Sequence, residues 1–204
     1  MQLRVNNLNI EVDVQGPAGG EPLLLVMGLG MQLVAWPDEL VADLAGRGFR
    51  VIRFDNRDAG LSAGMDHLGM PSMVGAMFRY GLHMPVPSPY RLDDMAADAL
   101  GVLDALGIGA AHVCGASMGG MIAQHMAAGQ PARVKSLTLL MTTSGARYLP
   151  QPRWAVRQTL MSRPRSNAVA DVVAHLENLL RVIGSPAYPP DTGRQRERLE
   201  ATVR

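Results

Sequence analysis

A five-residue motif, Gly-Ala-Ser-Met-Gly at residues 115–119, constrains this chain more than any other feature. The short apolar run His112–Cys114 precedes it, and a helical pattern follows. A serine with glycines two residues away on either side fits a strand-to-helix turn so sharp that side chains at the flanking positions would collide. Such a turn exposes the Ser117 hydroxyl beside a helix N-terminus, which favours negative charge. Ser117 is therefore the candidate nucleophile, and Gly115 and Gly119 are the residues that permit the turn.

Strand and helix patterns alternate between Leu23 and Met141. Apolar runs typical of buried strands occur at residues 23–27, 50–54, 111–114 and 134–141. Helical patterns occur at residues 38–47, 93–106 and 118–128. This alternation predicts an α/β fold, with a mostly parallel sheet and helices on both faces. Ahead of it, Asn6 and Asn7 predict the turn of an N-terminal hairpin.

Two stretches lack this alternation. Residues 63–90 have no clear period and contain several glycines and prolines, so we expect a long loop with a short helix. Residues 150–166 are rich in proline and arginine, and two helical patterns follow at residues 167–183 and 194–204. We therefore expect a core at residues 1–145 and a helical segment at residues 146–204.

The composition argues against several classes of partner. The formal net charge is +1, which gives no electrostatic basis for binding nucleic acid or an anionic membrane. No apolar run approaches the roughly 20 residues that a membrane-spanning helix needs. The first seven residues contain no apolar signal region, so we expect a cytoplasmic protein. The single cysteine, Cys114, cannot form an internal disulfide, and we interpret it as a small core residue.

Four matched places along the chain resemble the α/β-hydrolase fold superfamily. Residues 27–30, Met-Gly-Leu-Gly, follow the first buried strand, where the family has its oxyanion loop, and Trp36-Pro37 follows them. Residues 54–62, Phe-Asp-Asn-Arg-Asp-Ala-Gly-Leu-Ser, are similar to the family's Asp-x-Arg-Gly-x-Gly-x-Ser loop, with Asp58 in place of the first glycine. Residues 115–119 are similar to its nucleophile elbow. The motifs most resemble small-molecule esterases of the aclacinomycin methylesterase and enol-lactonase type, and residues 146–204 resemble the start of their helical cap.

The resemblance implies a hydrolase without a cofactor or metal, acting on a small apolar carboxylic ester or lactone. In such enzymes Ser117 would attack the carbonyl group and form an acyl-enzyme. The oxyanion hole consists of two backbone N–H groups, which by position belong to Leu29 and Met118. Hydrolysis of C–C bonds and perhydrolysis use the same elbow and stay open as related reactions. A non-catalytic binding module or an inactive fragment also stays open, because a fold alone does not establish chemistry.

Asp55, Arg57 and Asp58 could act in catalysis, but we interpret them as a structural network within their loop. Gly28 and Gly30 also fit the first two glycines of a dinucleotide fingerprint. The third position is Leu33, however, and no phosphate-binding Gly-Lys-Ser/Thr sequence occurs, so we expect no nucleotide cofactor.

A serine nucleophile needs a base, and the base needs an orienting acid. In the resembled family both come from late regions that have no counterpart here. His125 and His112 lie about 12 Å and about 16 Å from Ser117 along helix and strand, which is beyond hydrogen-bond reach. Distance does not exclude the other histidines, which lie in loops or the cap, but we interpret them as polar surface residues: His67, His83 and His175. An alternative acid position after the sixth strand, residues 142–144, holds no carboxylate.

We therefore expect the chain to be the N-terminal portion of a larger hydrolase. In that case the strand at residues 134–141 would present an open, apolar edge. Edges of this kind pair with other strands, so we expect either a further part of the polypeptide or self-association to cover it.

Overall fold

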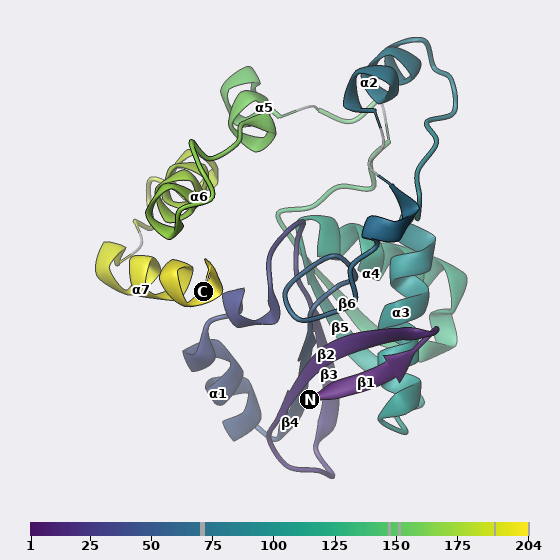
Figure 1. The fold of residues 1–204 in the computed structure, drawn as a ribbon. Coiled ribbons are helices and arrows are strands. Elements are labelled where there is room, and N and C mark those ends of the chain that lie inside the picture. Colours follow the sequence, from purple (N-terminus) through teal and green to yellow (C-terminus); the bar gives the residue numbers. More distant parts are fainter. Residues whose placement is uncertain (70–71, 147, 151, 190, 204) are drawn as a thin grey trace. The chain divides into compact units, whose positions relative to one another are not determined.

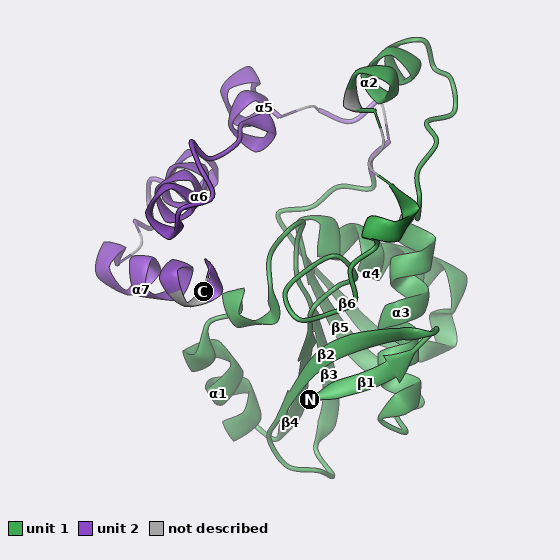
Figure 2. Ribbon diagram, viewed as in Figure 1, with its two compact units in different colours: residues 1–144 green, residues 145–204 purple. Residues whose placement is uncertain are grey.

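The computed structural model describes the chain except for residues 70–71, 147, 151, 190 and 204. The chain consists of two compact units, Met1–Ser144 and Gly145–Arg204 (Figure 2). The first unit contains strands and helices, and the second is helical (Figure 1).

An antiparallel hairpin begins the first unit. Its strands are β1 (Gln2–Val5) and β2 (Leu8–Gln15). Asn6 and Asn7 connect them with φ angles of 47° and 65°. Asparagine tolerates this left-handed region better than most residues, which is why an Asn-Asn pair can form the turn. The predicted hairpin is confirmed.

In the described part of the chain, six strands form one sheet in the order β1-β2-β4-β3-β5-β6 (Figure 1). The strands after the hairpin are β3 (Glu21–Val26), β4 (Phe49–Phe54), β5 (Ala111–Ala116) and β6 (Val134–Leu140). These four run parallel to one another, whereas β2 pairs antiparallel with β4. The mostly parallel sheet that the alternation predicts is confirmed.

Helices pack on both faces of this sheet. They are α1 (Asp38–Gly46), α3 (Leu92–Ala105) and α4 (Met118–Gly129). Leu24 and Val26 of β3 lie in the core cluster that contains residues of α3 and α4. Leu23 and Leu25 lie in the other cluster, which contains Val41 of α1. Because successive strand residues point to opposite faces, one continuous apolar run serves both clusters.

The long segment between β4 and α3 contains little regular structure. It includes the single-turn helix η2 (Asp66–Leu68) and the helix α2 (Met73–Gly81). Ser72 caps α2, because its hydroxyl accepts the N–H of Gly75 at 3.2 Å. The expected long loop with a short helix is confirmed. Two further single turns flank other helices, η1 (Leu33–Ala35) and η3 (Pro131–Arg133).

The second unit contains three helices, α5 (Trp154–Met161), α6 (Val169–Ile183) and α7 (Thr192–Val203), in its described residues. Helix α5 is not expected from the sequence pattern, because it lies in the stretch rich in proline. The prolines at positions 152 and 164 lie outside α5, however, so they bound the helix without interrupting it. In the described residues no strand follows β6, and no helix is long and apolar enough to cross a membrane.

Candidate active site

Ser117 lies at the turn between β5 and α4, between the last strand residue and the first helical residue. Its backbone has φ 54° and ψ −120°, a conformation that residues other than glycine rarely adopt. The side chain forms no capping hydrogen bond with α4 and is exposed. Strained residues with free side chains concentrate at functional sites, because the surrounding structure must hold them in place.

The two glycines of the motif allow the backbones of β5, α4 and β3 to approach one another closely at this turn. A Cβ atom added at Gly115 would lie 2.3 Å from the carbonyl oxygen of Gly119. One added at Gly119 would lie 2.1 Å from the carbonyl oxygen of Val26 in β3. Real Cβ atoms do not approach so closely, so neither position can take a side chain unless the backbone moves.

The end of β6 also holds the turn. The N–H of Ser117 donates to the carbonyl oxygen of Leu140 at 2.9 Å. In return the hydroxyl of Thr142 donates to the carbonyl oxygen of Ser117 at 2.6 Å. Both backbone polar groups of the strained residue are therefore satisfied, which reduces the cost of its conformation.

The loop after β3 passes beside Ser117. A Cβ atom added at Gly28 would lie 3.2 Å from Cβ of Ser117 and 3.7 Å from its Oγ. The next residue, Leu29, is 78% exposed. Met118 is the first residue of α4, so its N–H has no acceptor within the helix. Leu29 and Met118 both line a cavity of about 390 Å³. The structure thus brings the two predicted oxyanion residues to one cavity.

Arg57, on another wall of this cavity, is fixed by its neighbours. Its Nε donates to the carboxylate of Asp98 at 2.6 Å, and its guanidinium lies over the ring of Tyr90, 5.3 Å from the centroid. Burial and the hydrogen-bonded carboxylate of Asp58 raise the pKa of Tyr90 to about 12. The phenol therefore stays protonated at neutral pH.

Asp58 replaces the glycine of the resembled loop pattern and keeps the backbone shape that a glycine would adopt. Its φ is 61°, in the left-handed region that glycine enters freely and aspartate tolerates. Its carboxylate accepts the N–H of Met65 at 2.5 Å. Asp58 is thus bonded within its own segment, in keeping with the structural interpretation of this residue.

Two of the five histidines have partners elsewhere in the first unit. Nδ1 of His112 lies 2.6 Å from the Ser136 hydroxyl, and Nδ1 of His125 lies 2.5 Å from the Asp93 carboxylate. The other histidines lie in η2, after α2 and in α6: His67, His83 and His175. None of the hydrogen bonds seen in the described residues joins a histidine to Ser117.

Cys114 in β5 is half-buried, and burial raises the pKa of its thiol, which disfavours the thiolate. This agrees with its interpretation as a small core residue. Within the described residues, no group of three or more His, Cys, Asp or Glu side chains could hold a metal ion.

Two residues that shape the site, Tyr90 and Asn56, carry no recognisable signal in the sequence. Asn56 donates its amide to the carbonyl oxygen of Met27 at 3.0 Å, across 29 positions of sequence. No local pattern marks such a contact, because it depends on β3 and β4 being neighbours in the sheet.

Comparison with known proteins supports the resemblance to α/β hydrolases that the motifs indicate. Residues 21–182 match the family model described as alpha/beta hydrolase fold. A rhodomycin D methylesterase of Streptomyces sp. (strain C5) is 40% identical over 126 residues, which cover 62% of this chain and 36% of that protein. The 3-oxoadipate enol-lactonase 1 of Acinetobacter baylyi is 28% identical over 165 residues, covering 81% of this chain and 51% of that protein.

A solved structure shows the same fold. The enol-lactonase of Burkholderia xenovorans LB400 superposes with a TM-score of 0.68 at 22% identity, covering 100% of this chain and 67% of that one. The chain spans about a third to a half of the length of the two curated relatives. The family match, the motif geometry and the order of the sheet agree: the chain belongs to the α/β hydrolase fold family.

Proposed function

We propose that the protein is a serine hydrolase of small carboxylic esters or lactones and that Ser117 is its nucleophile. The observation that carries this proposal is the backbone of Ser117, held at φ 54° with an exposed side chain beside the loop after β3. A fold has no structural need for a strained, exposed serine at this place, whereas a nucleophile must reach its substrate.

The proposed reaction passes through an acyl-enzyme. Oγ of Ser117 bonds to the carbonyl carbon while its proton passes to a base, and the N–H groups of Leu29 and Met118 stabilise the oxyanion that forms. The ester C–O bond then breaks, and the base gives its proton to the leaving alkoxide. Water repeats the sequence on the acyl group and restores Ser117. The N-terminus of α4 adds a favourable field for the negative charge.

We propose a small, largely apolar substrate. The cavity of about 390 Å³ is near the lower end of the range for small-molecule sites. Leu92, Met95 and Met118 supply apolar surface on its walls. The names of the relatives, a methylesterase and an enol-lactonase, support an ester or a lactone as the substrate. We further propose that residues 146–204 act as a cap that selects among substrates.

The proposed reaction needs a base for Ser117 and an acid that orients the base. We propose that both come from polypeptide beyond residues 1–204. Two of the five histidines are bonded to Ser136 and Asp93, and residues 142–144 contain no carboxylate. The chain matches only 36% of the length of the methylesterase. A longer polypeptide offers room for both groups.

Trapping the acyl-enzyme tests the proposal. The protein as its gene encodes it is mixed with activated esters and lactones, quenched in acid and analysed by peptide mass spectrometry. We expect an acyl adduct on the peptide that contains Ser117, and hydrolysis that Ser117→Ala abolishes. Turnover that persists in Ser117→Ala would refute the assignment.

A non-catalytic binding module is the second candidate, because no described histidine is bonded to Ser117. It predicts ligand binding that Ser117→Ala leaves intact, with no product and no adduct from the parent protein. The same two proteins therefore separate the two candidates.

We also propose that β6 pairs with a second copy when the 204-residue chain is studied alone. Both faces of β6 are exposed, with Leu139 42% exposed, whereas Val113 of the neighbouring β5 is 1% exposed. We expect sedimentation velocity to detect association that grows with concentration and that Leu139→Lys reduces, because a charge opposes edge pairing. A monodisperse monomer at all concentrations would refute this.

A further inference from the structure

Three side chains from the end of β4 and the residues just after it hold the loop that follows β3. Asn56 donates to the carbonyl oxygen of Met27 at 3.0 Å. The carboxylate of Asp55 accepts the N–H of Leu33 at 2.6 Å. Arg53 donates to the carbonyl oxygen of Trp36 at 3.2 Å. All three side chains are buried. Residues 27–36, which we call the oxyanion loop, are thus tied at the beginning, the middle and the end.

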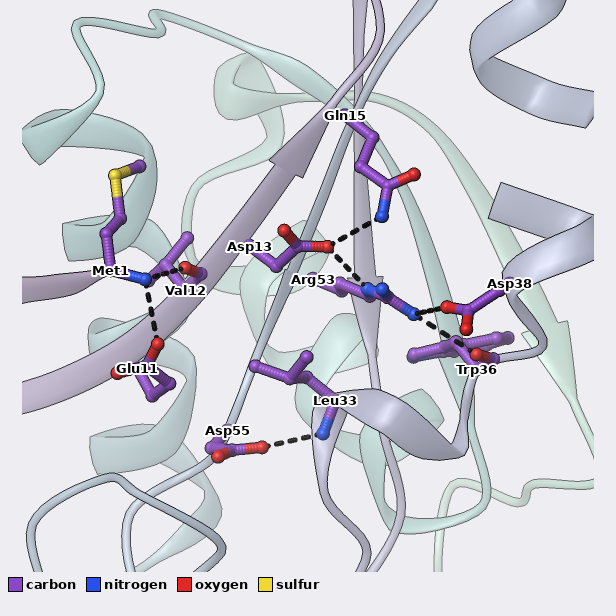
Figure 3. Close-up of polar contacts among 10 residues, drawn as sticks. All are labelled: Met1, Glu11, Val12, Asp13, Gln15, Leu33, Trp36, Asp38, Arg53 and Asp55. Atoms are coloured by element: carbon purple, nitrogen blue, oxygen red, sulfur yellow. Dashed lines mark hydrogen bonds and ion pairs between the residues drawn. The ribbon is translucent and has the colours of Figure 1, made fainter. Parts of the chain in front are cut away.

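Figure 3 shows two of these ties. The Asp55 carboxylate points at the backbone N–H of Leu33. Arg53 reaches the end of the loop and is itself held by the carboxylates of Asp13 and Asp38, at 2.7 Å and 2.8 Å. The guanidinium is therefore fixed on both sides, and so is the backbone that it binds.

Asp55 joins two loops with one carboxylate. Its second oxygen accepts the N–H of Leu61 at 2.9 Å, from the segment that follows β4. Gly60 packs so closely that a Cβ atom there would lie 2.0 Å from this oxygen. The side chain therefore has one position, with each oxygen used by a different loop.

The environment of Asp55 argues against a purely space-filling role. The residue is 2% exposed, and burial raises the pKa of its carboxyl group in spite of the two backbone N–H donors. The bonds that the described residues show for its carboxylate oxygens come from these two amides and from no cation. A buried carboxylate without a cationic partner is costly, so a compensating function is expected.

We propose that Asp55 is a positioning residue that holds the oxyanion loop in the geometry needed at Ser117. This rests on the proposed function, since it concerns the Leu29 donor of the oxyanion hole. Gly28 lies directly beside Ser117, because a Cβ atom added at Gly28 would lie 3.2 Å from Cβ of Ser117. A small shift of the loop therefore moves the N–H of the neighbouring Leu29 relative to Ser117. Oxyanion donors act only within a few tenths of an ångström of the correct place.

Asp55→Asn is the sharpest test, because it keeps the size of the side chain and replaces one acceptor oxygen with an NH₂ group. Either Leu33 or Leu61 then faces a donor. Asp98→Asn is the matched control: Asp98 is equally buried, but its partners are Arg57 and Asn6.

Hydrogen exchange of the gene-encoded protein is measured by mass spectrometry. We expect the peptide covering residues 28–36 to exchange at least about tenfold faster in Asp55→Asn and within about twofold of the parent rate in Asp98→Asn. Unchanged exchange in Asp55→Asn, or an equal rise in both variants, would overturn the proposal.

Kinetics with an ester that the parent hydrolyses supply a second readout. We expect kcat to fall about 100-fold in Asp55→Asn, with KM within about twofold, because the ground state does not need the oxyanion donors. Ser62→Ala, which removes a hydroxyl bonded to the backbone oxygen of Asp55, should leave both constants within about twofold. Faster exchange with an unchanged kcat would overturn the proposal.

The two proposals fail in different ways. If the parent shows no hydrolysis at all, the proposed function fails, while the exchange experiment still shows whether Asp55 holds the oxyanion loop.

Discussion

Two loops meet at Ser117, and they are held in different ways. The turn at residues 115–119 is held by close backbone packing: Gly119 lies where a Cβ atom would be 2.1 Å from the backbone of β3. The oxyanion loop is held by side chains that come from another strand, among them Asp55 and Asn56. A site can thus combine a turn that its own glycines mark in the sequence, because only glycine fits the close backbone packing, with a loop that is held by side chains from another strand.

Gly119→Ala should have the largest effect on stability, because it disrupts the turn at residues 115–119. The added methyl group meets the carbonyl oxygen of Val26, which belongs to a central strand and cannot move without breaking sheet hydrogen bonds. We expect the free energy of unfolding to fall by about 3 kcal/mol in denaturant titrations.

Gly129→Ala, at the end of the same helix, is the matched control, because a Cβ atom there has nothing within 4 Å. We expect it to change stability by less than about 1 kcal/mol, and in the stabilising direction. Equal losses in the two variants would show that packing against β3 does not hold the turn.

Asn56→Leu should have the next largest effect, on the second loop. It keeps the branching and the number of heavy atoms of the side chain but leaves the buried carbonyl oxygen of Met27 without its amide donor. We expect a loss of about 2 kcal/mol in the free energy of unfolding. Asn178→Leu, on the exposed surface of α6, should change it by less than about 0.5 kcal/mol. If the two variants were equally harmless, this tie would not stabilise the loop.

The smallest effect should be a pH dependence of the stability that Asp55 gives to the oxyanion loop. The turn at residues 115–119 should show no such dependence. Burial raises the pKa of Asp55, so the folded protein binds this proton more tightly than the unfolded chain does. The stability advantage of the parent over Asp55→Asn should then be greatest below about pH 4 and shrink as the pH rises through the raised folded pKa. Unfolding titrations of both proteins across this range measure it, and a difference independent of pH would contradict the assigned cause.

The same contrast explains what could be predicted from the sequence. Gly115, Ser117 and Gly119 mark their turn with a motif of five consecutive residues, although the contact that excludes a side chain at Gly119 comes from Val26 of β3, far along the chain. The bond from Leu33 to Asp55 spans 22 positions and exists only because β3 and β4 are neighbours, so no local pattern marks it. Helix α5 was missed because nearby prolines resemble a break, although they lie outside it.

Labelling with a fluorophosphonate probe tests the central claim, that Ser117 is the nucleophile, most directly. The probe reacts with activated serines, and the modified residue is located by peptide mass spectrometry of the gene-encoded protein. We expect one adduct, on the peptide containing Ser117, and none in Ser117→Ala. An adduct that persists in Ser117→Ala, or a parent protein that stays unlabelled, would contradict it.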